Sequence, residues 1–455
     1  MFELHNPQML MYFADRQGVG QACLLCGSVL LPGKADIANM QRAANEVYRI
    51  NDGLRTRFIE KDGKVYQEAK PYEEREFEVL RFDSREALDE WGRVYATIPL
   101  TLDRTVEGSG VPKSTWQSEK PSGKLVMNVL RHNTKMLLMR AKMGLLRQEP
   151  SCCDLRLVEL PDSYGAIVKL HHVIADGWTV MLIANQFIRF LKGDTPVAYS
   201  YEDFIKSEAE YAASNRYVRD CRFMEEQLSR CPEPTWVWPE VYTSLEASRR
   251  TVRLDAGLSG RIREYAQTHD VTPYTLFMTA LCVYMGRKLR REQFYVGSVV
   301  LNRTGVRERN TAGMFVHGVP LLMELLETDC FADALTRVRD TSFSGFRHQK
   351  GTAKTRDTKK LLYDVWISYQ DMGLEADAEA ECTQYYCNYT IDTTIFTIED
   401  RPRDECFTLH FDHNVKVTEP EVDELFHTVL SVLSEGMEDD GKLLSELCPK
   451  KGYGT

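Results

Sequence analysis

The chain has 455 residues, of which 43% are hydrophobic and 27% charged, and its formal net charge is −10. This length allows two or three domains with a sizeable core. The acidic balance argues against nucleic acids and anionic membranes as partners, because both attract a basic surface. No apolar run approaches the roughly 20 residues that span a bilayer, and the N-terminus lacks a signal-peptide pattern. We therefore expect a cytoplasmic protein.

The cysteines do not indicate a disulfide scaffold, because twelve of them are spread over the whole chain. Cys23 and Cys26 have the spacing of metal ligands, but no second Cys or His pair lies at a zinc-site distance from them. Their surroundings, "ACLLCGSVLL", predict a buried strand instead. We expect reduced, mostly buried thiols, and neither a metal nor a cofactor bound by this chain.

Expected strands and helices alternate along the chain, which predicts an α/β fold. The elements of the first half are a strand at 23–31, a helix at 35–50, a hairpin at 53–69 with its turn at Lys61-Asp62-Gly63, and a strand at 166–172. Those of the second half are a helix at 273–289 capped by Thr272, a strand at 294–300 and a last helix at 419–437. "GDTPVAYSYEDF" predicts a boundary between two parts, 1–193 and 194–455.

Residues 105–150 differ from their surroundings, with eight Lys/Arg against three Asp/Glu in an otherwise acidic chain. "LVMNVLRHNTKMLLMRAKMGLL" predicts a basic, partly amphipathic helix. Such a face suits an acidic partner or a membrane surface, and a solvated surface insertion explains it equally well.

The stretch "KLHHVIADGWTV" (169–180) contains the candidate site. Side chains alternate along a strand, so His171 and His172 point to opposite faces, and only one of them can face a cleft. Asp176 is placed to cap the following helix, and Gly177 permits a tight passage into it. The apolar face of that helix, which ends at Gly193, is expected to comprise Trp178, Met181, Ala184, Phe187, Ile188 and Leu191. A neutral imidazole at a strand end could act as a general base, and a buried histidine pair is the structural alternative.

"HHVIADGWT" resembles the HHxxxDG signature of nonribosomal peptide synthetase condensation domains, in the chloramphenicol-acetyltransferase-like superfamily. Further stretches match the family's motifs in order: "NPQMLMYFADRQ", "INDGLRTRF", "YEDF", "VGSVVLNRT", "AGMFVHGVPLL" and "LLYDVWISYQD". The resemblance covers nearly the whole chain except the insertion at 105–150.

This resemblance implies two acetyltransferase-like lobes in a V-shaped pseudo-dimer with a central tunnel. It also implies an acyltransferase that joins a carrier-bound acyl or peptidyl thioester to a carrier-bound aminoacyl amine. By the same resemblance His172 is the general base or positioning group, His171 its structural neighbour, and Asp176 the partner of Arg303. Gly177 would let the thioester approach the backbone, and Trp178 and His317 are candidates for the tunnel wall.

Some positions depart from the family pattern. Asn51 and Asp52 replace a His-Glu pair, and His317 replaces the Asn of the GxFVN motif. Donor and acceptor carrier proteins are the expected partners, with their substrates on phosphopantetheine arms, and we expect a monomer. Two alternatives stay open: transfer from CoA or a carrier to a soluble amine or alcohol, and a non-catalytic carrier-binding platform.

Overall fold

The computed structural model describes residues 1–107, 149–231, 233–239, 246–353, 362–371, 379–390, 394–401 and 404–447. Most of the predicted basic insertion at 105–150 therefore lies outside the described residues. The described part is mixed α/β, as the alternating pattern predicted. None of its helices is both long and apolar enough to cross a membrane.

The contacts divide the chain into two compact units, but not at the predicted boundary near 193. The first unit runs from Met1 to Ala213, and two later segments return to it: Leu301–Val316 and the segment that contains strand β13. The helix at the expected boundary, α6 (Tyr201–Ala212), is held in this unit. The amide of Tyr201 donates to Asp52 Oδ1 over 2.9 Å, and its hydroxyl donates to the Met314 carbonyl over 2.7 Å. The composition of "GDTPVAYSYEDF" predicted a boundary there, but composition carries no information about these two hydrogen bonds.

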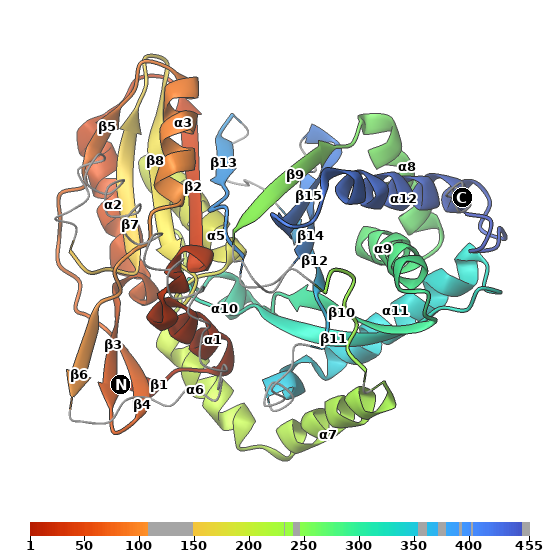
Figure 1. Cartoon of the computed structure of the whole chain (residues 1–455). Coiled ribbons are helices and arrows are strands. Elements are labelled where there is room, and N and C mark those ends of the chain that lie inside the picture. The colour runs from red at the N-terminus through yellow and green to blue at the C-terminus, as the bar shows by residue number, and fades with distance from the viewer. Residues whose placement is uncertain are drawn as a thin grey trace. The chain divides into compact units, whose positions relative to one another are not determined.

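The main sheet of the first unit has helices on both faces (Figure 1). Its described strands, in spatial order, are β13 (Glu381–Tyr385), β2 (Leu24–Pro32), β8 (Ser163–His171), β7 (Cys153–Glu159) and β5 (Val79–Arg81). Helix α3 (Arg85–Ala96) packs on the face that carries Ile167. Helices α2 (Ile37–Ile50) and α5 (Gly177–Leu191) cover the opposite face.

A smaller sheet in the same unit contains the predicted hairpin. In spatial order, its described strands are β1 (Phe2–Glu3), β4 (Lys64–Ala69), β3 (Thr56–Lys61) and β6 (Arg104–Glu107). Asp62 and Gly63 form the two-residue turn, with φ angles of 51° and 75°. Both angles are left-handed, as the turns that best join twisted antiparallel strands require. Helix α1 (Asn6–Ala14) precedes the hairpin in the chain.

The second unit has a sheet whose described strands, in spatial order, are β11 (His317–Glu324), β10 (Gln293–Val300), β12 (Val365–Asp371), β14 (Thr394–Arg401), β15 (Cys406–Asn414) and β9 (Ala247–Arg253). Its helices are α7 (Asn215–Arg230), α8 (Ala256–Thr268), α9 (Pro273–Leu289), α11 (Phe331–Arg347) and α12 (Glu419–Glu438). Helix α9 begins as predicted, because the Thr272 side chain accepts the amide hydrogen of Thr275 over 3.2 Å.

Strand β15 of the second unit has one apolar face and one polar face. On β15, Phe407, Leu409 and Phe411 belong to the helix-covered core. Thr408, His410 and Asp412 point the other way, because successive strand residues face opposite sides. These three side chains lie on the face of the sheet opposite helices α8, α9 and α12, and they are buried there.

Candidate functional site

The two histidines lie where strand β8 passes into helix α5. His171 is the last residue of β8, and His172 is the first residue of the turn that follows, so the strand ends one position earlier than predicted. The amide of His172 donates to the Cys23 carbonyl, just before β2, over 2.7 Å. The amide of Ile174 donates to the His171 carbonyl over 3.0 Å and closes the turn. The backbone on both sides of His172 is therefore fixed by hydrogen bonds.

His171 points into the packing and is fully buried. Its Nδ1 accepts the amide hydrogen of Val173 over 3.1 Å, so the ring proton is on Nε2. That Nε2 lies 3.5 Å from Asp15 Oδ1, and Arg104 donates to the other oxygen of Asp15 over 2.9 Å. Because Nδ1 is hydrogen-bonded to a backbone amide and Nε2 is buried beside Asp15, His171 presents no accessible ring nitrogen to a substrate.

His172, in the turn after the strand, is half-buried. Burial lowers its pKa below the ordinary value of 6.5, against opposing contributions from backbone hydrogen bonds and from the charge of Asp176. Its Nδ1 atom is buried. A lowered pKa keeps the imidazole neutral at physiological pH, which is the form that accepts a proton.

We expect His172 to titrate below pH 6.5 in the folded protein. Because the folded state disfavours the charged ring, the free energy of unfolding should fall as the pH drops through 6.5. An NMR titration of the histidine ring protons, assigned with His172→Gln, measures this pKa directly. A His172 pKa at or above the ordinary value of 6.5 would contradict the assignment of a neutral base.

Asp176 and Arg303 form a buried ion pair, as the resemblance implied. Both side chains are at most 1% exposed, and the Arg303 Nη2 atom lies 2.9 Å and 3.0 Å from the two oxygens of Asp176. Asp176 also caps α5 by accepting the amide hydrogen of Thr179 over 2.9 Å. The amide of Phe315 donates to its second oxygen over 3.1 Å. Every partner of this carboxylate is a donor, so Asp176 holds the turn together and is not available as a base.

The segment Leu301–Val316 completes this cluster. The other terminal nitrogen of Arg303 donates to the Thr311 carbonyl over 2.7 Å, and its guanidinium lies 3.9 Å from the centre of the Phe315 ring. Thr179 Oγ1 bonds to the Gly313 carbonyl over 2.8 Å. Phe315, Thr179 and Asp15 were not predicted as site residues. Phe315 lies within the family-like stretch "AGMFVHGVPLL", so the motif could have predicted it as a site residue. Asp15 belongs to no pattern that would have predicted its contact with His171.

Gly177 is the first residue of α5, and its φ angle is not among the positive ones of the described glycines. The passage into α5 therefore does not depend on a backbone conformation that only glycine adopts readily. The lack of a side chain near His172 remains the reason to expect a close approach of substrate there.

Trp178 and His317 were the predicted wall residues. Trp178 is half-buried in the first turn of α5, and its Nε1 donates to the Arg309 carbonyl over 2.9 Å. It thus ties the Leu301–Val316 segment to the helix and is not part of the helix's apolar face. Of the predicted apolar face, Met181, Ala184, Phe187 and Ile188 are buried and Leu191 is half-buried; Val180, Ile183 and Phe190 are buried as well. His317 begins β11 in the second unit, whereas His172 belongs to the first, so its place in a tunnel wall stays a prediction.

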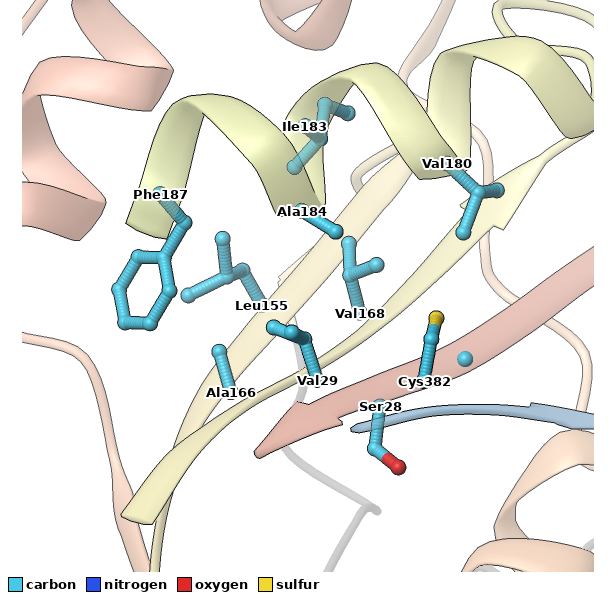
Figure 2. A pocket seen from close by; sticks show the side chains of 11 residues that line it. Ser28, Val29, Leu155, Ala166, Val168, Val180, Ile183, Ala184, Phe187 and Cys382 are labelled. Carbon is cyan, nitrogen blue, oxygen red and sulfur yellow. The ribbon is translucent and has the colours of Figure 1, made fainter. Parts of the chain in front are cut away.

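A small apolar cavity of about 20 Å³ lies under α5 (Figure 2). Val180, Ala184 and Phe187 of α5 point into it from one side, and Val168 of β8 from the other. Its volume is that of about one water molecule, and its lining offers few polar partners for one. The cavity between α5 and the sheet is therefore a small packing defect and is too small to hold a substrate.

Comparison with known proteins places the chain in a family. The Condensation domain family model matches residues 143–447, which is more than half of the chain. The chain belongs to the condensation domain family, as its motifs predicted. Members of this family in nonribosomal peptide synthetases are acyltransferases that form amide bonds.

Curated relatives include two large synthases from a bacterium and a fungus. Surfactin synthase subunit 1 of Bacillus subtilis (strain 168) is 21% identical over 92% of this chain and 11% of its own length. The PKS-NRPS hybrid synthetase psoA of Aspergillus fumigatus is 23% identical over 74% of this chain and 8% of its own length. The chain thus spans about a tenth of the length of these relatives.

Solved structures show the same fold. The condensation domain of the monacolin K polyketide synthase has a TM-score of 0.76 at 16% identity, covering 97% of this chain and 98% of the other. The starter condensation domain of rhizomide synthetase, solved with C8-CoA, has a TM-score of 0.76 at 16% identity, covering 97% and 96%. These folds have two chloramphenicol-acetyltransferase-like lobes, so that prediction is confirmed.

Proposed function

We propose that this chain condenses a carrier-bound acyl or peptidyl thioester with a carrier-bound aminoacyl amine to form an amide, with His172 as general base or positioning group. The observation that carries the proposal is the half-buried His172 on a turn held rigid by the Asp176–Arg303 pair. The family and the synthase relatives support the reaction class.

The proposed step forms one C–N bond and breaks one C–S bond. The neutral amine attacks the thioester carbonyl, a proton leaves the nitrogen toward His172, and the departing thiolate takes up a proton. Because Nδ1 of His172 is buried, we assign the base to Nε2. His171 and Asp176 are excluded as bases, since their acceptor atoms are occupied by protein donors.

Most of the rate acceleration is expected to come from positioning the two substrates. Holding two reactants in the correct geometry contributes about 7–11 kcal/mol, whereas a general base contributes about 10²–10⁴-fold in rate. We therefore expect the carriers to matter more than the base, and a His172 variant to keep residual activity.

A second candidate is transfer of an acyl group from CoA, or from one carrier, to a soluble amine or alcohol. It is favoured by one observation, that a structurally similar starter condensation domain was solved with C8-CoA. Both candidates use His172 in the same role and differ in what delivers the donor and the acceptor.

The test is an intact-mass assay with the whole chain. One reaction contains a donor-loaded carrier and an aminoacyl-loaded carrier, and a matched one contains acyl-CoA and the free amino acid. We expect the acyl mass to move to the acceptor carrier in the first reaction and far more slowly in the second. Efficient transfer from acyl-CoA to the free amino acid would support the second candidate. Carrier binding without any transfer would support a non-catalytic platform and contradict both.

A further inference from the structure

Three polar side chains lie in a row on the face of the second unit's sheet that is opposite helices α8, α9 and α12. Thr251 belongs to the edge strand β9, His410 to its neighbour β15, and Glu399 to the next strand, β14. Thr251 and His410 are directly opposite each other, and Glu399 is the diagonal neighbour of His410 on the other side. Cross-strand neighbours on one face are within contact distance.

Each of the three side chains is in contact with the next. Thr251 Oγ1 is 2.8 Å from His410 Nδ1, and His410 Nε2 is 3.2 Å from Glu399 Oε1. Since His410 stands on the middle strand, its two ring nitrogens reach in opposite directions. The other oxygen of Glu399 accepts two hydrogen bonds from Arg401, at 3.0 Å and 2.7 Å.

The contact with Glu399 favours one tautomer of His410. Arg401 donates two hydrogen bonds to one oxygen of Glu399, and this pairing favours the ionised carboxylate. The other oxygen lies 3.2 Å from His410 Nε2 and favours the proton on that nitrogen, which leaves Nδ1 as the acceptor. The Thr251 hydroxyl then donates to Nδ1, which is the arrangement of a nucleophile beside its base.

Thr251 is exposed, whereas His410 and Glu399 beneath it are 8% and 1% exposed. The Leu254 amide donates to the Phe407 carbonyl over 2.9 Å. In an antiparallel pair every second residue is hydrogen-bonded to its partner strand, so counting back from Leu254 the bonded residues are Val252 and Arg250, and not Thr251. By this alternation the amide of Thr251 points away from β15, toward the open edge. A backbone donor thus lies next to the hydroxyl, where it can stabilise a developing oxyanion.

We propose that Thr251, His410 and Glu399 form a second acyl-accepting site, in which Thr251 takes an acyl group from a small thioester. The Thr251 oxygen attacks the thioester carbonyl, its proton passes to His410 Nδ1, a C–O bond forms and the C–S bond breaks. The proton then passes from His410 to the thiolate, so the products are an ester on Thr251 and a free thiol. The site does not depend on His172.

The test treats the whole chain with S-acetyl-N-acetylcysteamine and follows acetylation by peptide mass spectrometry. Thr105, an exposed threonine on β6, is the internal control in the same digest. We expect Thr251 to be acetylated at least about 10²-fold faster than Thr105, with His410→Phe removing most of this difference. Thr251→Ser should keep the modification, and Thr251→Val should lose it.

The controls separate this site from the proposed function. The His172→Ala chain should be acetylated at Thr251 at the wild-type rate. A chain that does not catalyse condensation therefore still tests whether Thr251 accepts an acyl group. If His410→Phe does not fold, Glu399→Gln provides the readout, and it should also slow the modification. Acetylation of Thr251 no faster than that of Thr105, or unchanged in a folded His410→Phe or Glu399→Gln chain, would overturn the proposal.

Discussion

Replacing Arg303 with alanine is expected to lower the free energy of unfolding of the first unit by about 3–5 kcal/mol, because it leaves the charge of Asp176 buried without a partner. Both side chains are at most 1% exposed, so water cannot replace the lost guanidinium. The same change removes a donor to the Thr311 carbonyl and the stacking on Phe315. The turn that carries His172 should loosen with them.

Hydrogen exchange in helix α5, together with urea unfolding, measures this effect. Arg303→Lys should be intermediate, since a lysine keeps the charge but cannot reproduce the planar set of donors. Arg222→Ala is the matched control, because its partner Glu226 is 2.9 Å away and both side chains are more than half exposed. Removing an exposed pair should have no measurable effect. Equal stability of the Arg303→Ala and Arg222→Ala chains would show that the buried pair does not hold the site.

Replacing His172 with alanine is expected to slow amide formation by about 10²–10⁴-fold while the chain stays folded. His172 is half-buried, and its backbone amide is what holds the turn, so alanine keeps the structural hydrogen bond to Cys23. Single-turnover rates with loaded carriers measure the loss, and urea unfolding checks the fold.

His171→Ala is the matched variant, because it removes a fully buried ring that contacts Asp15 and Val173. We expect it to lose stability first and activity only as a consequence. If His171→Ala retained full stability but lost transfer, while His172→Ala transferred normally, the roles of the two histidines would be reversed.

Local signals predicted the elements that carry the site. The helix cap at Asp176, the left-handed turn at Asp62-Gly63 and the cap at Thr272 each depend on a few adjacent residues, so the sequence contains all the information they need. The motif order also identified Arg303 as the partner of Asp176, a contact between residues far apart in the chain. That prediction came from the resemblance and not from spacing.

Long-range pairing could not be predicted in the same way. Strand β13 comes late in the chain and pairs with β2 near its beginning, with Tyr385 3.1 Å from Ser28 and Arg85 donating to Thr383 over 2.6 Å. Nothing in a five-residue strand of mixed polarity specifies such a partner. The contact of His171 with Asp15 is hidden for the same reason, because many acidic residues precede the motif.

The role of His172 in amide formation is decided by the mass of the acceptor carrier after one turnover, with wild-type chain and His172→Ala side by side. We expect wild type to add the full acyl mass through an amide to the aminoacyl group, and His172→Ala to add it about 10²–10⁴-fold more slowly. An acceptor carrier that gains the acyl mass equally fast with both chains would contradict the assignment of His172.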